Sequence, residues 1–156
     1  MRRRDRELKH TETLLAILEQ SPVGRIATVD RKGYPVIKPV NFVYWDGKIY
    51  LHSSTKGEKI SDIRRGSFVC FEVDEPVAYV AAIEPACKST YYYRSVIIKG
   101  NAVIVNRVDK KSEILERLMK KYQPEGGYEG VKKEILRRTA VIEISIRKMT
   151  GKEHLG

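Results

Sequence analysis

The sequence is poor in cysteine and in long apolar runs, and both absences narrow its class. It has 156 residues and two cysteines, with no CxxC pair. A disulfide framework is therefore not expected, and a chain of this length can bury a core without one. No segment reaches the roughly 18 apolar residues of a membrane span, and no apolar core of a signal peptide follows the basic first residues. We expect one cytoplasmic domain over residues 1–156.

Histidine is also scarce, and its placement does not favour a metal site. His10, His52 and His154 are far apart in sequence and have no carboxylates at ligand spacing. Cys70 lies in an apolar strand pattern and is expected to be a small core residue. Cys87 lies in a loop-like stretch, where a thiol can be inert or reactive.

Positive charge is what the sequence has in excess. It has 30 Lys and Arg against 20 Asp and Glu, which gives a formal net charge of +10. Such a field attracts phosphorylated cofactors and dinucleotides as well as nucleic acids. Most basic clusters alternate with glutamates on predicted helices, which is typical of a solvated face, and aromatic and basic residues combine only at residues 91–94. We expect no nucleic-acid partner, although charge alone does not exclude one.

The hydrophobic periodicity predicts a chain of strands with a few helices. Turn signals and apolar stripes predict helices over residues 6–20, 58–65, 109–122 and 128–138. Asp5 is the predicted cap of the first of these helices. Alternating or β-branched runs predict strands over residues 23–29, 36–45, 48–53, 67–73, 77–83, 91–106 and 140–146, with Gly100 as a bend or bulge. The pattern indicates an antiparallel β-barrel of about six or seven strands with helices outside it.

The stretch from residue 36 to 65 is chemically the most distinctive. Asp46-Gly47 predicts a hairpin turn between its two strands. The second strand leads through hydroxyl residues, lysines and Gly57 into a helix start. Hydroxyls, positive charge and the free N–H groups of a helix start together favour a phosphate site. The alternative is that Ser54 or Thr55 only caps the helix and that Lys59 is a solvated helix lysine.

The order of these segments resembles a known family. The run VGRIATVDRKGYPVIKPVNFVYWDGKIYLHSSTKGEKISDIRRGSFVCFEVDE, followed by ACKSTYYYRSVIIKGNAVIV and IEISIRKMTGKE, is similar to the pyridoxamine 5'-phosphate oxidase-like split-barrel flavoproteins, and most to the branch with the nitroimidazole-resistance proteins. The resemblance implies a mostly β fold with flanking helices and FMN at the interface of a homodimer. The C-terminal segment lacks the basic and aromatic pattern of the pyridoxamine oxidases proper, so vitamin B6 oxidation is not expected.

The resemblance also implies which residues would hold FMN. The main chain of one strand would hold the ring edge, the strand-to-helix stretch would hold the phosphate, and a later strand would line the same cleft. In this order the residues are Pro39, Val40, Asn41 and Phe42; His52, Ser53, Ser54, Thr55, Lys56 and Lys59; and Tyr93, Arg94 and Ser95.

Several of these residues have an ordinary alternative. Asn41 can satisfy sheet hydrogen bonds, Arg94 can be a surface cation, and His52 can be a hydrogen-bonded strand-end histidine. Lys56 stands where the related branch is variable.

The function that the resemblance implies is an FMN-dependent oxidoreductase. A reduced nicotinamide would supply electrons, and a nitro compound, a quinone or dioxygen would accept them. His52 is the candidate catalytic proton donor, because its ordinary pKa lies near neutrality. The alternative is a protein of the same fold that binds flavin, haem or a deazaflavin without turnover.

Overall fold

A single antiparallel sheet organises the part of the chain that this computed structural model describes, residues 3–156. The strands are β1 (Glu7–Leu8), β2 (Gly24–Val29), β3 (Pro35–Val40), β4 (Phe42–Trp45), β5 (Lys48–Ser54), β6 (Phe68–Val80), β7 (Thr90–Val105) and β8 (Thr139–His154). The helices are α1 (Thr11–Gln20), α2 (Glu58–Arg65), α3 (Val108–Tyr122) and α4 (Lys133–Arg138), with short 3-10 turns at Arg4–Arg6 and Ala86–Lys88.

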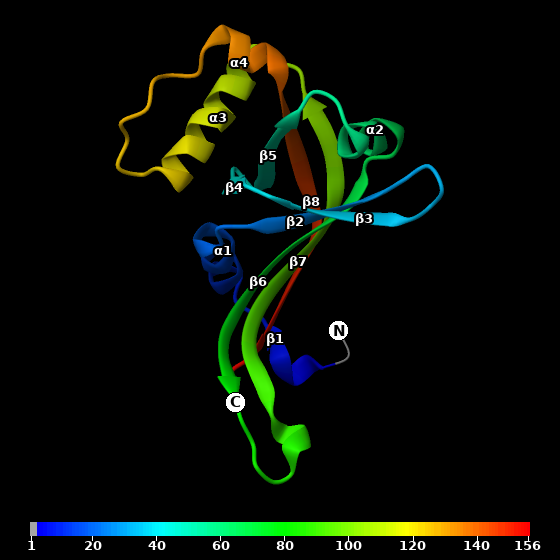
Figure 1. The fold of residues 1–156 in the computed structure, drawn as a ribbon, viewed down its shortest axis with the longest axis vertical. Helices are drawn as coiled ribbons and strands as arrows, with labels where there is room; N and C mark the ends of the chain where they lie inside the picture. The colour runs from blue at the N-terminus through cyan, green and yellow to red at the C-terminus, as the bar shows by residue number, and fades with distance from the viewer. Residues whose placement is uncertain (1–2) are drawn as a thin grey trace.

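The order of the strands in space explains why the barrel is split. Within the described residues the order is β3-β2-β6-β7-β8-β5-β4, and β1 pairs with β8. β3 and β4 stand at opposite ends of this order, although only Asn41 separates them in sequence. The sheet therefore curves so that one residue joins its two ends without a ladder between them (Figure 1). The predicted mostly β, split-barrel architecture is confirmed, but residues 36–45 form two strands and not one.

The barrel interior holds the main hydrophobic core. Phe42, Phe71 and Ile98 are fully buried there, and the two phenylalanine rings meet edge to face with centroids 4.9 Å apart. Burying such side chains stabilises a fold by about 2 kcal/mol each. A smaller cluster lies outside the barrel, where Tyr50 and Val141 pack under α3 and α4.

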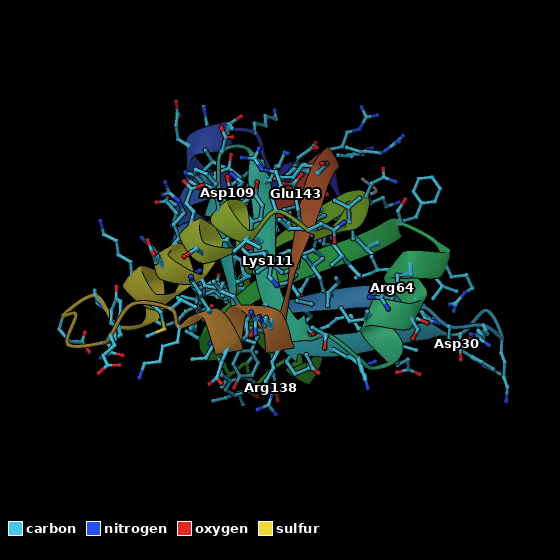
Figure 2. All side chains as sticks on the ribbon, turned by 90° about the horizontal axis from the view of Figure 1, so that it is seen from above. Asp30, Arg64, Asp109, Lys111, Arg138 and Glu143 are labelled. Atoms are coloured by element: carbon cyan, nitrogen blue, oxygen red, sulfur yellow. The ribbon has the colours of Figure 1, made fainter. Side chains whose placement is uncertain are left out.

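The helices lie on different sides of the sheet. α3 packs on β4, β5 and β8, whereas α2 packs against β2 and β7. Figure 2 shows α3 and α4 on one side of the molecule and α2 on the opposite side. The end of β5 that leads into α2 is therefore not covered by α3.

The N-terminal segment differs from the prediction. The first helix begins at Thr11, and Asp5 pairs with Arg3 and caps no helix. The residues before the helix form β1, whose Leu8 pairs with Gly151. They extend the sheet along the far half of β8, which explains why the helix starts late.

Two predicted boundaries are wrong because bulges interrupt the alternation of side chains. The predicted strands 67–73 and 77–83 are one strand, β6, with a register shift between Pro76 and Ala78; proline has no N–H for the ladder. β8 does not end at residue 146 but continues to His154, with a shift opposite Lys99 and Gly100. The register shifts at Gly100, where a bend or bulge was predicted, but the extra residue is Arg147 of the neighbouring strand β8. Of the helix predicted over residues 128–138, only residues 133–138 are helical, and they form α4.

The prediction that Cys70 is a core residue is wrong. Val69, Phe71 and Val73 of β6 face the barrel interior and are buried, so the alternating Cys70 faces outward and is only partly buried. Cys87 is exposed, in agreement with its predicted loop.

Gly24 gives a test of the packing inside the barrel. A Cβ at this position would overlap the ring of Phe71, which is buried and cannot move away. We expect Gly24→Ala to lower the free energy of unfolding by about 2 kcal/mol, measured by urea denaturation. Gly66→Ala is the control, because a Cβ there meets open space. Equal effects of the two substitutions would contradict this account.

Candidate functional site

The end of β5 delivers a helix start that no side chain caps. Gly57 is the N-cap of α2, with φ of 124°, and no side chain donates or accepts a capping hydrogen bond there. The Ser54 hydroxyl instead accepts a hydrogen bond from the Lys56 N–H at 3.4 Å. Neither Ser54 nor Thr55 therefore caps α2, and the alternative prediction for them is wrong. The first N–H groups of a helix have no partner within the helix, so this end can hold an anion.

Two lysines add positive charge beside this helix start. Lys59 on α2 is half-buried, and among the described residues no ion pair or hydrogen bond neutralises its ammonium group. Burial, and then the charge of Lys38, lowers the pKa of Lys59. Lys38 on β3 donates a hydrogen bond to Glu58 at 2.5 Å. The site thus has more positive than negative charge at close quarters.

Lys38 is a site residue that the sequence analysis missed. It lies three residues before Asn41, and nothing in its own segment indicates an anion site. Its position beside α2 depends on the path of β3 past that helix. Only the tertiary structure could reveal this.

His52 lies on the outward side of β5, at the edge of the same cluster. Protein atoms partly desolvate its ring, and this burial, followed by the charge of Lys59, lowers the pKa of His52. The imidazole is therefore mostly neutral near pH 7 in the free protein. A bound anion near Lys59 would oppose this effect and favour the protonated form.

A buried carboxylate fastens α2 to the sheet. Asp62 is 4% exposed and accepts hydrogen bonds from Thr28 at 2.8 Å and from Arg65 at 2.9 Å. Arg65 also donates to the main-chain oxygen of Val29. Burial alone would raise the pKa of Asp62, but the hydrogen bonds from Arg65 and Thr28 outweigh it and the pKa is lowered. This network sets where α2 presents Lys59.

The four residues predicted to hold a ring edge lie where β3 passes into β4. The side chains of Val40 and Phe42 are buried in the core, whereas Pro39 and Asn41 are exposed. The Phe42 N–H donates a hydrogen bond to the hydroxyl of Tyr122 at 2.9 Å. Tyr122, on α3, is another residue that sequence reasoning missed, because 80 residues separate it from Phe42.

The third predicted group, Tyr93, Arg94 and Ser95 on β7, lies far from the start of α2. Tyr93 pairs with His154 at the end of β8, whereas His52 pairs with Val141 near its start. A strand of 16 residues such as β8 spans roughly 50 Å. Figure 1 shows the first part of β7 near the C-terminus and α2 near the opposite end. We call the start of α2 with Lys38, His52 and Lys59 the phosphate-type cluster. One chain therefore does not bring Tyr93, Arg94 and Ser95 to this cluster.

Arg94 already has carboxylate partners on both neighbouring strands. Its guanidinium lies 3.3 Å from Glu153 of β8 and 3.9 Å from Glu75 of β6. These are part-exposed pairs of modest strength, which an incoming anion could replace.

Two kinds of feature are absent from residues 3–156. They contain no group of three or more His, Cys, Asp or Glu side chains that could hold a metal ion. No helix in this part of the chain is long and apolar enough to cross a membrane.

Comparison with known proteins identifies the family. The family described as pyridoxamine 5'-phosphate oxidase matches residues 10–153. The chain belongs to the pyridoxamine 5'-phosphate oxidase family. Comparison with curated proteins finds none that matches.

Three solved structures illustrate how widely this family's fold is shared. A candidate 5-nitroimidazole antibiotic resistance protein from Bacteroides thetaiotaomicron is 22% identical with a TM-score of 0.83, over 94% of this chain and 86% of that one. The flavocytochrome Anf3 from Azotobacter vinelandii is 23% identical with a TM-score of 0.88, over 100% and 72%. An FAD and haem binding protein from Mycobacterium smegmatis is 21% identical with a TM-score of 0.87, over 97% and 74%. At these identities the likeness is one of fold.

The Asp62 network predicts a pH-dependent loss of stability. We expect Asp62→Asn to lower the free energy of unfolding by about 2 kcal/mol at pH 7, because an amide cannot accept on both sides the hydrogen bonds from Thr28 and Arg65 that the buried carboxylate accepts. Since the folded pKa of Asp62 is lowered, its contribution is present above the unfolded value of about 3.9 and is lost as pH falls through the folded value. Urea denaturation at pH 7 and at pH 3 should show the difference shrinking. Glu116→Gln, at an exposed carboxylate, is the control; an equal loss there would refute the assignment.

Proposed function

We propose that this protein is a cytoplasmic, homodimeric FMN-binding flavoprotein that acts as an oxidoreductase. It would pass electrons from a reduced nicotinamide to a small acceptor such as a nitro compound, a quinone or dioxygen. The observation that carries the proposal is the uncapped start of α2 beside the unneutralised Lys59. Such a site fits the phosphate monoester of FMN.

The donor set around this point is consistent with a phosphate. Ser53, Ser54 and Thr55 can donate through their hydroxyls, the first turn of α2 through main-chain N–H groups, and Lys59 through its ammonium. Lys38 would join them by turning from Glu58 toward the anion. The exposed Lys56 would contribute charge at the rim.

The remaining residues suggest how a flavin would be held and used. The exposed main chain at Pro39 and Asn41 would hold the ring edge, since β3 has only β2 as a strand neighbour among the described residues. When bound, the flavin supplies a ring that accepts electrons from one substrate and gives them to another. His52 would supply a proton, because an anion beside Lys59 would raise the pKa of His52, which burial and then the charge of Lys59 lower.

Two features support a homodimer. Large apolar side chains are exposed on the three consecutive strands β3, β2 and β6, namely Ile37 at 64%, Val29 at 51% and Phe68 at 72%. Phe68 and Val29 also line an apolar hollow of about 540 Å³ on the outside of the barrel. In addition, Tyr93, Arg94 and Ser95 lie far from the phosphate-type cluster of their own chain, so only a second copy could bring them to it.

The structural relatives are consistent with a flavin ligand and keep one alternative open. Their names include a flavocytochrome and a protein that binds both FAD and haem. A second candidate function is therefore cofactor binding without turnover. It is favoured by the surroundings of His52, which has no hydrogen-bonded carboxylate among the described residues to orient it as an acid.

The first test is the visible absorption spectrum after incubation with FMN and desalting. We expect a flavin spectrum, reduced on addition of NADH or NADPH, and FMN binding at least tenfold weaker in Lys59→Ala because a charge-assisted hydrogen bond is lost. Lys120→Ala on α3 removes the same charge from an exposed position and is the control. A haem spectrum or a flavin that no nicotinamide reduces would favour the binding-only alternative. Absence of FMN uptake would overturn the proposal.

The pH dependence of binding gives a second test. The lowered pKa values of His52 and Lys59 in the free protein rise when an anion binds beside them, so binding takes up protons. We expect calorimetry near pH 7 in buffers of different ionisation enthalpy to show proton uptake that is smaller in His52→Gln. The titration of the FMN phosphate itself is common to both proteins and cancels in the difference. Equal uptake by both would exclude His52 from the site.

A further inference from the structure

The hydroxyl of Tyr122 meets three main-chain groups from two distant segments. It accepts the hydrogen bond from the Phe42 N–H at 2.9 Å, and lies 3.1 Å from the Phe42 oxygen and 2.9 Å from the Pro22 oxygen. A phenol has one proton, so it donates to one of these two carbonyls at a time. Burial raises the pKa of Tyr122, which keeps the hydroxyl protonated at neutral pH.

The neighbouring residue of α3 holds Phe42 from another side. The Lys121 ammonium lies 3.8 Å from the centre of the Phe42 ring and donates a hydrogen bond to the Leu18 oxygen at 3.2 Å. Burial lowers the pKa of Lys121 to about 8. The C-terminal end of α3 thus fastens both the main chain and the ring of the first residue of β4, and Figure 1 shows α3 beside this strand.

This attachment matters because of what precedes Phe42. Asn41 belongs to no strand and joins the two ends of the open sheet. Strand pairing on the β3 side ends at Val40, which pairs with Gly24, and resumes on the β4 side at Phe42, which pairs with Leu51. Between these points no ladder fixes the main chain. The Tyr122 hydroxyl holds the main chain of Phe42, the first residue after this gap.

We propose that Tyr122 is a positioning residue that fixes the main chain at the junction of β3 and β4 and, through it, the ligand bound along that junction. The part about the ligand rests on the proposed FMN function. The part about the main chain does not. Tyr122 itself need not touch the ligand, because its hydroxyl is already engaged by Phe42 and Pro22.

The test compares Tyr122→Phe with Tyr50→Phe. Each change removes one tyrosine hydroxyl, from Tyr122 at the end of α3 or from Tyr50 beneath α3, and the Tyr50 hydroxyl donates to Glu143 of β8 at 3.0 Å and not to the main chain of the junction. In FMN-free protein, we expect faster amide hydrogen exchange at residues 41–43 in Tyr122→Phe alone. In FMN-loaded protein, we expect about tenfold weaker FMN binding and an altered visible circular dichroism of the flavin in Tyr122→Phe, with neither change in Tyr50→Phe.

Each outcome decides part of the inference. Unchanged exchange at residues 41–43 in Tyr122→Phe would overturn it, as would equal effects of the two substitutions. Faster exchange with unchanged FMN binding and dichroism would overturn the link to the ligand. If the wild-type protein takes up no FMN, the proposed function fails, and the exchange data alone decide whether Tyr122 holds the junction. Should Tyr122→Phe not fold, rapid exchange of the Phe42 amide in the wild-type protein would count against the inference and slow exchange for it.

Discussion

The constraint on which the structure depends is the passage from β3 to β4 through the single residue Asn41. Because these strands stand at the two ends of the sheet, the whole sheet must curve until its ends are one residue apart. The same passage leaves main-chain groups without ladder partners at a place where the core residues Val40 and Phe42 allow little movement. Exposed main-chain groups between such fixed core residues are suited to hold the edge of a flat ligand.

The charges beside the junction of β3 and β4 are arranged at a cost to stability. Lys59 is half-buried and has no counter-ion among residues 3–156, and burial, followed by the charge of Lys38, lowers its pKa. The buried Asp62 holds α2 in place through its hydrogen bonds with Thr28 and Arg65. Rigid support for unneutralised charge is typical of a binding site and is not needed for folding.

The sequence predicted those structural features that are determined by residues close together in the chain. The turn at Asp46-Gly47, helix α2 and the irregularity at Gly100 were predicted because each has its own chemistry in sequence, although the extra residue of that irregularity lies on β8. The roles of Lys38 and Tyr122 were missed, because they depend on which strand or helix passes nearby. The resemblance grouped Tyr93, Arg94 and Ser95 with the phosphate residues, but it could not show that one chain holds them far apart.

The bulge in β8 has a consequence for how the sequence encodes this strand. Before it, the even-numbered Ile144 and Ile146 face the interior, and after it the odd-numbered Met149 and Gly151 do. The extra residue, Arg147, therefore acts like a change of reading frame within one continuous strand. If β8 instead ran straight through Arg147 without the bulge, every later side chain would turn to the opposite face, so Lys148 and Lys152 would point into the barrel. Sequence comparisons across this point must allow a one-residue gap if they are to align faces as well as letters.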